Sequence, residues 1–79
     1  MEISMIVYIK FIDGSTGEYD IYASCDNEER LTDAIAKGAP ILGFAGNWNS
    51  FTKTFTRFQD VGVTIINTRN VSKVTLLDS

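Results

Sequence analysis

Residues 62–77 constrain the fold of this 79-residue chain more than any other stretch. Four polar residues, Asn67-Thr68-Arg69-Asn70, separate two apolar runs there. The apolar residues are Val63, Ile65 and Ile66 in the first run, and Val71, Val74, Leu76 and Leu77 in the second. β-Branched side chains favour strands over helices, and asparagine tolerates left-handed backbone and bonds its own backbone in turns. The stretch therefore predicts two strands joined by a tight connection.

Residues 3–12 predict a strand that is apolar on both faces. One face carries Ile3, Met5, Val7, Ile9 and Phe11, and the other is also largely apolar. Such a strand is usually central in a sheet, or is covered on its second face by a helix or another subunit. Asp13-Gly14-Ser15-Thr16-Gly17 provides a turn, and residues 18–23 alternate again, with Tyr19, Ile21 and Ala23 facing inward. We therefore expect a hairpin in this part of the chain.

Residues 26–37 predict the helix. Asp26 is placed to act as N-cap, and Glu29 is placed to reach back to it in a capping box. Gly38 supplies a left-handed C-cap, and Pro40 prevents the helix from continuing. The apolar residues of the helix are Leu31, Ala34 and Ile35. Because they form only a narrow stripe, we expect the helix to cover part of a sheet.

Residues 41–58 predict a short strand, a loop and a second strand. The strand covers 41–45, and the loop covers 46–50 and holds Trp48. Residues 51–58 have threonine at positions 52, 54 and 56, which suits a strand with one hydroxyl face. The aromatic residues of this region have helical spacing instead, at positions 48, 51, 55 and 58. Because threonine and phenylalanine both favour strands, we predict a strand.

In chain order these elements are two strands, a helix and four more strands. They predict a single α+β domain over residues 1–79. We expect a small, mostly antiparallel and strongly bent β-sheet, or an open barrel, with one short helix. Because so short a chain buries little surface by itself, we also expect a homo-oligomer.

The counts of histidine and cysteine limit the chemistry of the chain. Histidine is absent and Cys25 is the single cysteine, so an internal disulfide or a Cys/His zinc site cannot form and the usual general base is missing. We therefore expect no catalytic residues, no metal and no cofactor, and we interpret Cys25 as a packed structural side chain. A lone cysteine fits a reducing compartment, and the apolar segment 5–12 is too short to span a membrane. We expect a cytoplasmic protein of bacterial or phage origin that has no membrane partner.

The net charge of −3 is unevenly distributed. Residues 1–46 hold eight acidic and three basic side chains, whereas residues 47–79 hold four basic and two acidic ones. An acidic chain is not drawn to phosphate as a whole, so nucleic-acid binding would require a local basic face. The acidic segment 13–33 offers a surface for a basic partner instead.

Aromatic and basic residues gather between positions 48 and 57. As a strand, this segment places Phe51, Lys53, Phe55 and Arg57 on one face, an alternation of rings and cations that can stack bases and pair with phosphates. The interpretation that we favour puts both phenylalanines in the core, with the cations extending to solvent. Trp48, between two asparagines, is a candidate hot spot for a protein partner. The candidate partner-binding residues are Trp48, Phe51, Lys53, Phe55, Arg57 and Arg69.

These features predict a non-enzymatic protein-interaction module. We expect a small homo-oligomeric accessory or inhibitor protein that binds itself and a second, unidentified protein. The alternative is a small β-barrel that binds single-stranded nucleic acid, such as RNA, through Phe51, Lys53, Phe55, Arg57 and Arg69. Salt-dependent binding of an oligonucleotide would distinguish the two, because phosphate contacts release counterions.

Overall fold

A computed structural model describes residues 5–22 and 28–77. Their elements, in chain order, are β1 (Met5–Phe11), β2 (Thr16–Tyr22), α1 (Glu28–Lys37), β3 (Ile41–Asn49), β4 (Thr54–Arg57), β5 (Val63–Ile66), the 3-10 helix η1 (Thr68–Asn70) and β6 (Val71–Leu76). This order confirms the predicted one. No helix within the described ranges has the length and apolar character to cross a membrane.

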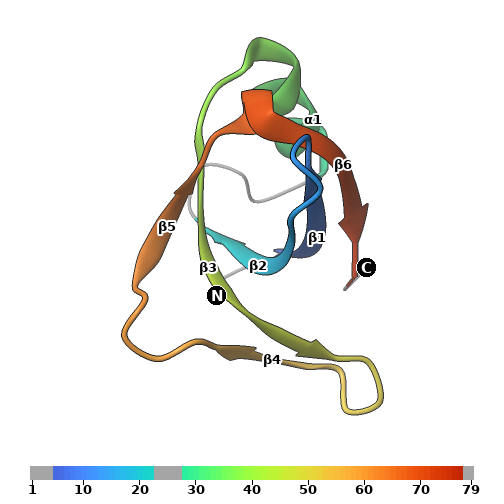
Figure 1. Ribbon diagram of the computed structural model, residues 1–79. Coiled ribbons are helices and arrows are strands. Elements are labelled where there is room, and N and C mark those ends of the chain that lie inside the picture. The colour runs from blue at the N-terminus through green and yellow to red at the C-terminus, as the bar shows by residue number, and fades with distance from the viewer. Residues whose placement is uncertain (1–4, 23–27, 78–79) are drawn as a thin grey trace.

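All six strands belong to one antiparallel sheet. Its order is β4-β3-β2-β1-β6, and β5 pairs with β3 as well. The sheet bends so strongly that η1 connects β5 at one end of it to β6 at the other (Figure 1). Because β5 and β6 are not paired with each other, the sheet is an open barrel, as predicted.

β1 supplies the centre of the hydrophobic core. It lies between β2 and β6, and its residues Met5, Val7 and Ile9 are buried inside the barrel. On its opposite face Ile6 is also buried, which agrees with a strand that is apolar on both sides. The remaining buried core residues are Ile21, Leu31, Ile41 and Ile66. Each such side chain contributes about 1.5–3 kcal/mol relative to an exposed one.

The predicted hairpin of β1 and β2 is confirmed. The two strands pair from Met5↔Ile21 to Lys10↔Thr16. In the turn, the Asp13 Oδ1 atom accepts hydrogen bonds from the Ser15 backbone N–H at 2.9 Å and from the Ser15 hydroxyl at 2.6 Å. These bonds favour the charged carboxylate and lower the pKa of Asp13.

The C-terminal end of α1 has the predicted glycine cap. Gly38 has φ +71°, its N–H donates to the Ile35 carbonyl at 3.2 Å, and the Ala39 N–H donates to the Ala34 carbonyl at 2.9 Å. These two bonds define a Schellman motif. Leu31 is buried in the core, and Ala34 and Ile35 pack against it, so the narrow apolar stripe covers the barrel as expected. The interpretations of Asp26 as N-cap and of Cys25 as a packed side chain lie outside the described residues.

The connection between β5 and β6 crosses from one end of the sheet to the other. The sequence predicted a tight connection here. In agreement with it, the Asn67 Oδ1 atom accepts a hydrogen bond from the Arg69 backbone N–H at 3.1 Å. The buried Thr68 hydroxyl donates to the Ala39 carbonyl at 2.8 Å and so joins η1 to the segment that follows α1. The two strands of residues 62–77 exist, but each has a different partner, β3 for β5 and β1 for β6.

β4 and β5 lie on the same side of β3, one after the other. The Phe58 N–H donates to the Ala45 carbonyl at 2.9 Å, and Val63 pairs with the adjacent Phe44. Residues 59–62 therefore bulge out between two neighbouring positions of β3 and interrupt what would be one long strand.

Gly38 should be more sensitive to substitution than its backbone angle alone requires. A β-carbon there would lie 2.7 Å from the Arg69 Nε atom, whereas Gly62, with a similar φ of +69°, has no atom within 4 Å of that position. We expect Gly62→Ala to cost about 1–2 kcal/mol through left-handed strain, and Gly38→Ala to cost up to about 1 kcal/mol more, because the flexible Arg69 side chain must shift to make room. Urea unfolding measures both. Adding Arg69→Ala to Gly38→Ala should remove the extra cost relative to Gly62→Ala. Equal costs for Gly38→Ala and Gly62→Ala would contradict a close contact between residue 38 and the Arg69 side chain.

Candidate functional site

The second half of β3 and the whole of β4 form a hairpin that projects from the barrel. We call residues 46–57 the arm; it pairs from Gly46↔Arg57 to Asn49↔Thr54. In Figure 1 the arm extends below the barrel, away from α1. The arm contains five of the six residues predicted to bind a partner.

The predicted end of β3 at Ala45 and the loop over residues 46–50 are wrong. β3 continues to Asn49, and Trp48 is a strand residue that pairs with Phe55. Glycine and asparagine have low strand propensity, but cross-strand side-chain pairing overrides it. Gly46 allows this pairing, because a β-carbon there would lie 2.7 Å from the Phe55 ring.

Segment 51–58, for which the sequence offered both a strand and a helix, is a strand in its second half. The helical alternative is wrong. Thr54–Arg57 form β4, whereas residues 51–53 belong to the turn of the arm, which covers residues 50–53. The Asn49 Oδ1 atom accepts from the backbone N–H groups of Phe51 and Thr52 at 3.0 and 3.2 Å, and Lys53 takes a left-handed φ of 57°. The sequence had suggested that Phe51 and Lys53 share one strand face with Phe55 and Arg57. Because Phe51 and Lys53 lie in the turn, that prediction is wrong.

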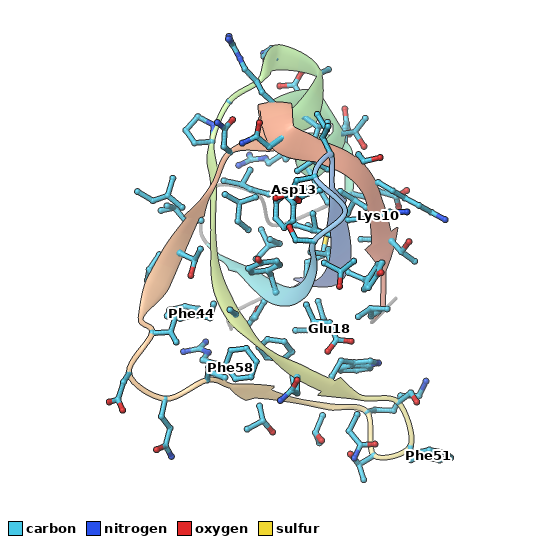
Figure 2. The ribbon with its side chains drawn as sticks, viewed as in Figure 1. Lys10, Asp13, Glu18, Phe44, Phe51 and Phe58 are labelled. Atoms are coloured by element: carbon cyan, nitrogen blue, oxygen red, sulfur yellow. The ribbon has the colours of Figure 1, made fainter. Side chains whose placement is uncertain are left out.

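The tip of the arm presents a fully exposed aromatic ring. Phe51 is 97% exposed, so the favoured interpretation of this residue as part of the core is wrong. Figure 2 shows its side chain at the far end of the arm, pointing away from the rest of the molecule. Lys53, in the same turn, is also exposed. The tip thus combines one ring and one cation on a turn that the Asn49 side chain holds in shape.

Arg57 anchors the base of the arm. Its guanidinium lies 3.3 Å from the Asp20 Oδ2 atom and 3.7 Å from the centre of the Phe44 ring. The Asp20 side chain is only 13% exposed, so the ion pair satisfies a carboxylate that is largely removed from water. We call this group of three side chains the clamp. Arg57 thus has partners within the fold and does not extend freely into solvent.

A second carboxylate of β2 supports the arm. The Glu18 Oε1 atom accepts from the Trp48 backbone N–H at 3.0 Å. β2 pairs with β3 only as far as Gly46, so its backbone does not reach this N–H. The Glu18 side chain takes the place of the missing strand carbonyl.

Arg69 lies apart from the other five predicted residues. It belongs to η1, and its side chain passes close to Gly38 at the C-terminal end of α1. A cation is favoured there by the negative end of the helix dipole. The structure therefore assigns Arg69 a place beside the helix and not on the arm.

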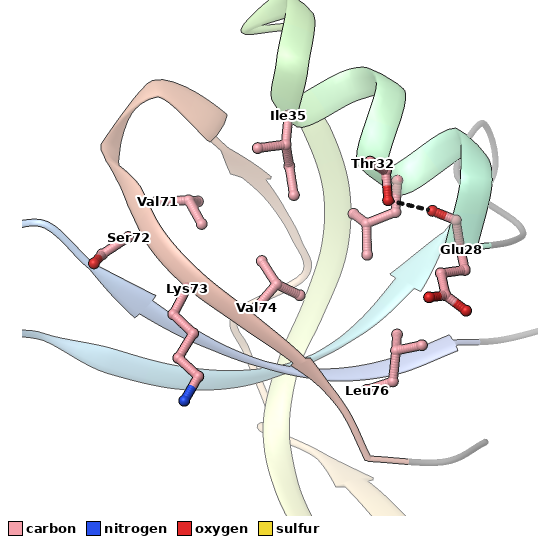
Figure 3. Close-up of a pocket in the computed structure, with 9 residues that line it drawn as sticks. Glu28, Thr32, Ile35, Val71, Ser72, Lys73, Val74 and Leu76 are labelled. Carbon is pink, nitrogen blue, oxygen red and sulfur yellow. Dashed lines mark hydrogen bonds between the residues drawn. The ribbon is translucent and has the colours of Figure 1, made fainter.

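The sequence did not suggest a groove between α1 and β6 (Figure 3). Its volume is about 290 Å³. The apolar lining consists of Leu31, Ile35, Val71, Val74 and Leu76. At its rim the Thr32 hydroxyl donates to the Glu28 carbonyl at 2.9 Å. No group of three His, Cys, Asp or Glu side chains suited to a metal ion occurs in residues 5–22 and 28–77.

The clamp should contribute to the stability of the fold. Removing Arg57 leaves Asp20 without its cation, so we expect Arg57→Ala to cost about 1–2 kcal/mol. Half of the Arg57 side chain is exposed, and solvent screening keeps the cost below that of a buried pair. Trp48, the single tryptophan, reports urea unfolding by fluorescence. The same change in an Asp20→Asn background should cost about 0.5–1 kcal/mol less, and additive effects would contradict the coupling.

No protein-family model matches this chain, and neither a curated protein nor a solved structure matches it.

Proposed function

We propose that this chain is a non-enzymatic, self-associating protein-interaction module of the cytoplasm, of the accessory or inhibitor kind, which binds a partner protein through the tip of its arm. The observation that carries the proposal is the 97% exposed side chain of Phe51. Moving a phenylalanine side chain from water into a partner's pocket is worth about 1.5–3 kcal/mol.

The arm also supports the proposal by its construction. Asn49 fixes the turn at the tip, while Arg57 and Glu18 connect its base to the barrel. A side chain whose backbone is already held in a fixed turn loses less conformational entropy when it binds, so more of its burial becomes affinity. Aromatic residues at the centre of an interface often dominate its energy.

The placement of the basic residues argues against the nucleic-acid alternative. Arg57 is engaged by Asp20 and Phe44, and Arg69 lies beside α1. Lys53 remains as the cation at the tip, and one phosphate contact provides weak affinity and a shallow salt dependence.

A photoreactive phenylalanine analogue tests the tip as a docking site. Placed at Phe51 in cells of the native host, it should crosslink to one discrete protein. The same analogue at Ile12, which is 69% exposed in the β1–β2 turn, should not capture that protein. Equal capture from both positions would contradict docking through the arm.

An oligonucleotide-binding measurement tests the alternative. Binding of a labelled single strand should be weak and nearly unchanged by Lys53→Ala, which avoids the structural effect of altering Arg57. Tight, salt-sensitive binding that Lys53→Ala removes would replace the proposed partner protein by nucleic acid.

A further inference from the structure

β5 presents a stripe of exposed apolar side chains. Val63 and Ile65 point outward from the same face of the strand, and Val61 precedes them in the bulge; all three are exposed, Ile65 to 72%. On the neighbouring strand Leu42 pairs with Ile65, so its half-buried side chain extends this apolar surface. We call these four residues the β5 patch. Phe44 pairs with Val63 but is not part of it, because the Arg57 guanidinium of the clamp lies over its ring.

One edge of β5 has no partner among the strands that the structure describes. β5 pairs with β3 on one side, and no described strand pairs with its other side. Alternate backbone N–H and C=O groups along that edge are left for water or for another strand. In Figure 1 this strand lies at the outer side of the barrel.

The three terminal strands of the sheet differ in how they are protected from edge pairing. A charged side chain hinders the pairing of an exposed edge: β6 carries the exposed Lys73, and β4 carries Arg57, whose cation the clamp holds over β3. Residues 61–66 contain no charged side chain. β5 is therefore the terminal strand whose side chains permit pairing with another chain.

We propose that β5 pairs with β5 of a second copy of this chain, antiparallel, about a two-fold axis at Thr64. In this register Val63 faces Ile65 of the second copy and Thr64 faces its own counterpart. Directly opposed residues of an antiparallel pair lie on the same face of the sheet, so outward side chains meet outward side chains. A shift of one residue would place the apolar stripe against the opposite face.

The charges of the molecule favour a second copy at this place. A two-fold axis sets each surface against itself, so a charged surface would repel its counterpart. The acidic first turn of α1 and the basic residues of the arm are unsuited to such a contact, whereas the neutral β5 patch is compatible with it. Two short strands and their flanking side chains make an interface smaller than the about 1,200 Å² of a standard stable complex, so we expect a weak dimer with an affinity no tighter than micromolar.

Sedimentation velocity from about 10 to 500 µM tests the contact, since this range brackets micromolar dissociation constants. The wild-type chain should dimerise as its concentration rises. Ile65→Lys places a cation on the patch of each copy and should weaken dimerisation at least about 30-fold. Ile12→Lys is the matched control, because it makes the same change at a similarly exposed isoleucine and should dimerise like the wild type. Equal melting temperatures of the two variants would show that folding is unaffected.

A single cysteine tests the register. In a Cys25→Ser background, Thr64→Cys places two thiols opposite each other across the axis, within the Cα separation of about 4.4–6.8 Å that a disulfide spans. Mild oxidation should yield a covalent dimer. Thr75→Cys, at an exposed position of β6, should yield little. Equal crosslinking from both positions would overturn the two-fold register.

The inference rests on the self-association in the proposed function, and the outcomes separate the two. If the wild-type chain stays monomeric throughout the concentration range, both the β5 contact and self-association are overturned. The docking of a partner protein at the arm is unaffected by this result, because the crosslinking experiment at Phe51 tests it separately. An oligomer that Ile65→Lys does not weaken overturns the β5 contact alone. Assembly into a species larger than a dimer would indicate head-to-tail pairing, and this result would also overturn the two-fold β5 contact.

Discussion

The length of β3 determines how the rest of the molecule is arranged. At about 3.3 Å per residue, its nine residues extend for about 30 Å, nearly the full 33 Å of the longest dimension of the molecule. β2 accompanies β3 only as far as Gly46. The remainder of the strand has no place around the core, so it leaves the barrel with β4 as its partner. The bulge over residues 59–62 then returns the chain to the barrel as β5.

The arm lies outside the core, so polar contacts hold it in position, whereas apolar burial stabilises the barrel. Asp20 and Glu18 both project from the outer face of β2, and both hold the arm, one through Arg57 and the other through the backbone of Trp48. The acidic character of the first half of the chain therefore has a structural use. Two of the carboxylates that suggested a surface for a basic partner already have partners within the fold.

Local patterns predicted the elements whose signals are local. The alternation in β1 and β2 and the combination of Gly38 and Pro40 identified the hairpin and the end of the helix, because those features depend on residues close in sequence. The extension of β3 depends on β4 and on Glu18, which is 30 positions away from Trp48. The turn over residues 50–53 lacks glycine and proline, so the exposure of Phe51 had no clear sequence signal. The β5 patch did have a sequence signal, which is a run of residues without charge. The unpaired edge of β5 in the described sheet, in contrast, follows from the topology alone.

The ladder between β1 and β6 has a consequence for the order of folding. It joins Val7 to Leu76, 69 positions along the chain, and places β6 beside β1 at one end of the sheet. Closing so long a loop costs about 4 kcal/mol in chain entropy before any contact compensates for it, whereas the β1–β2 hairpin closes over a few residues. We expect the hairpins to form first and β6 to dock last. By microscopic reversibility β6 is also the first strand to detach, so its amide hydrogens should exchange with solvent ahead of those in the centre of the sheet.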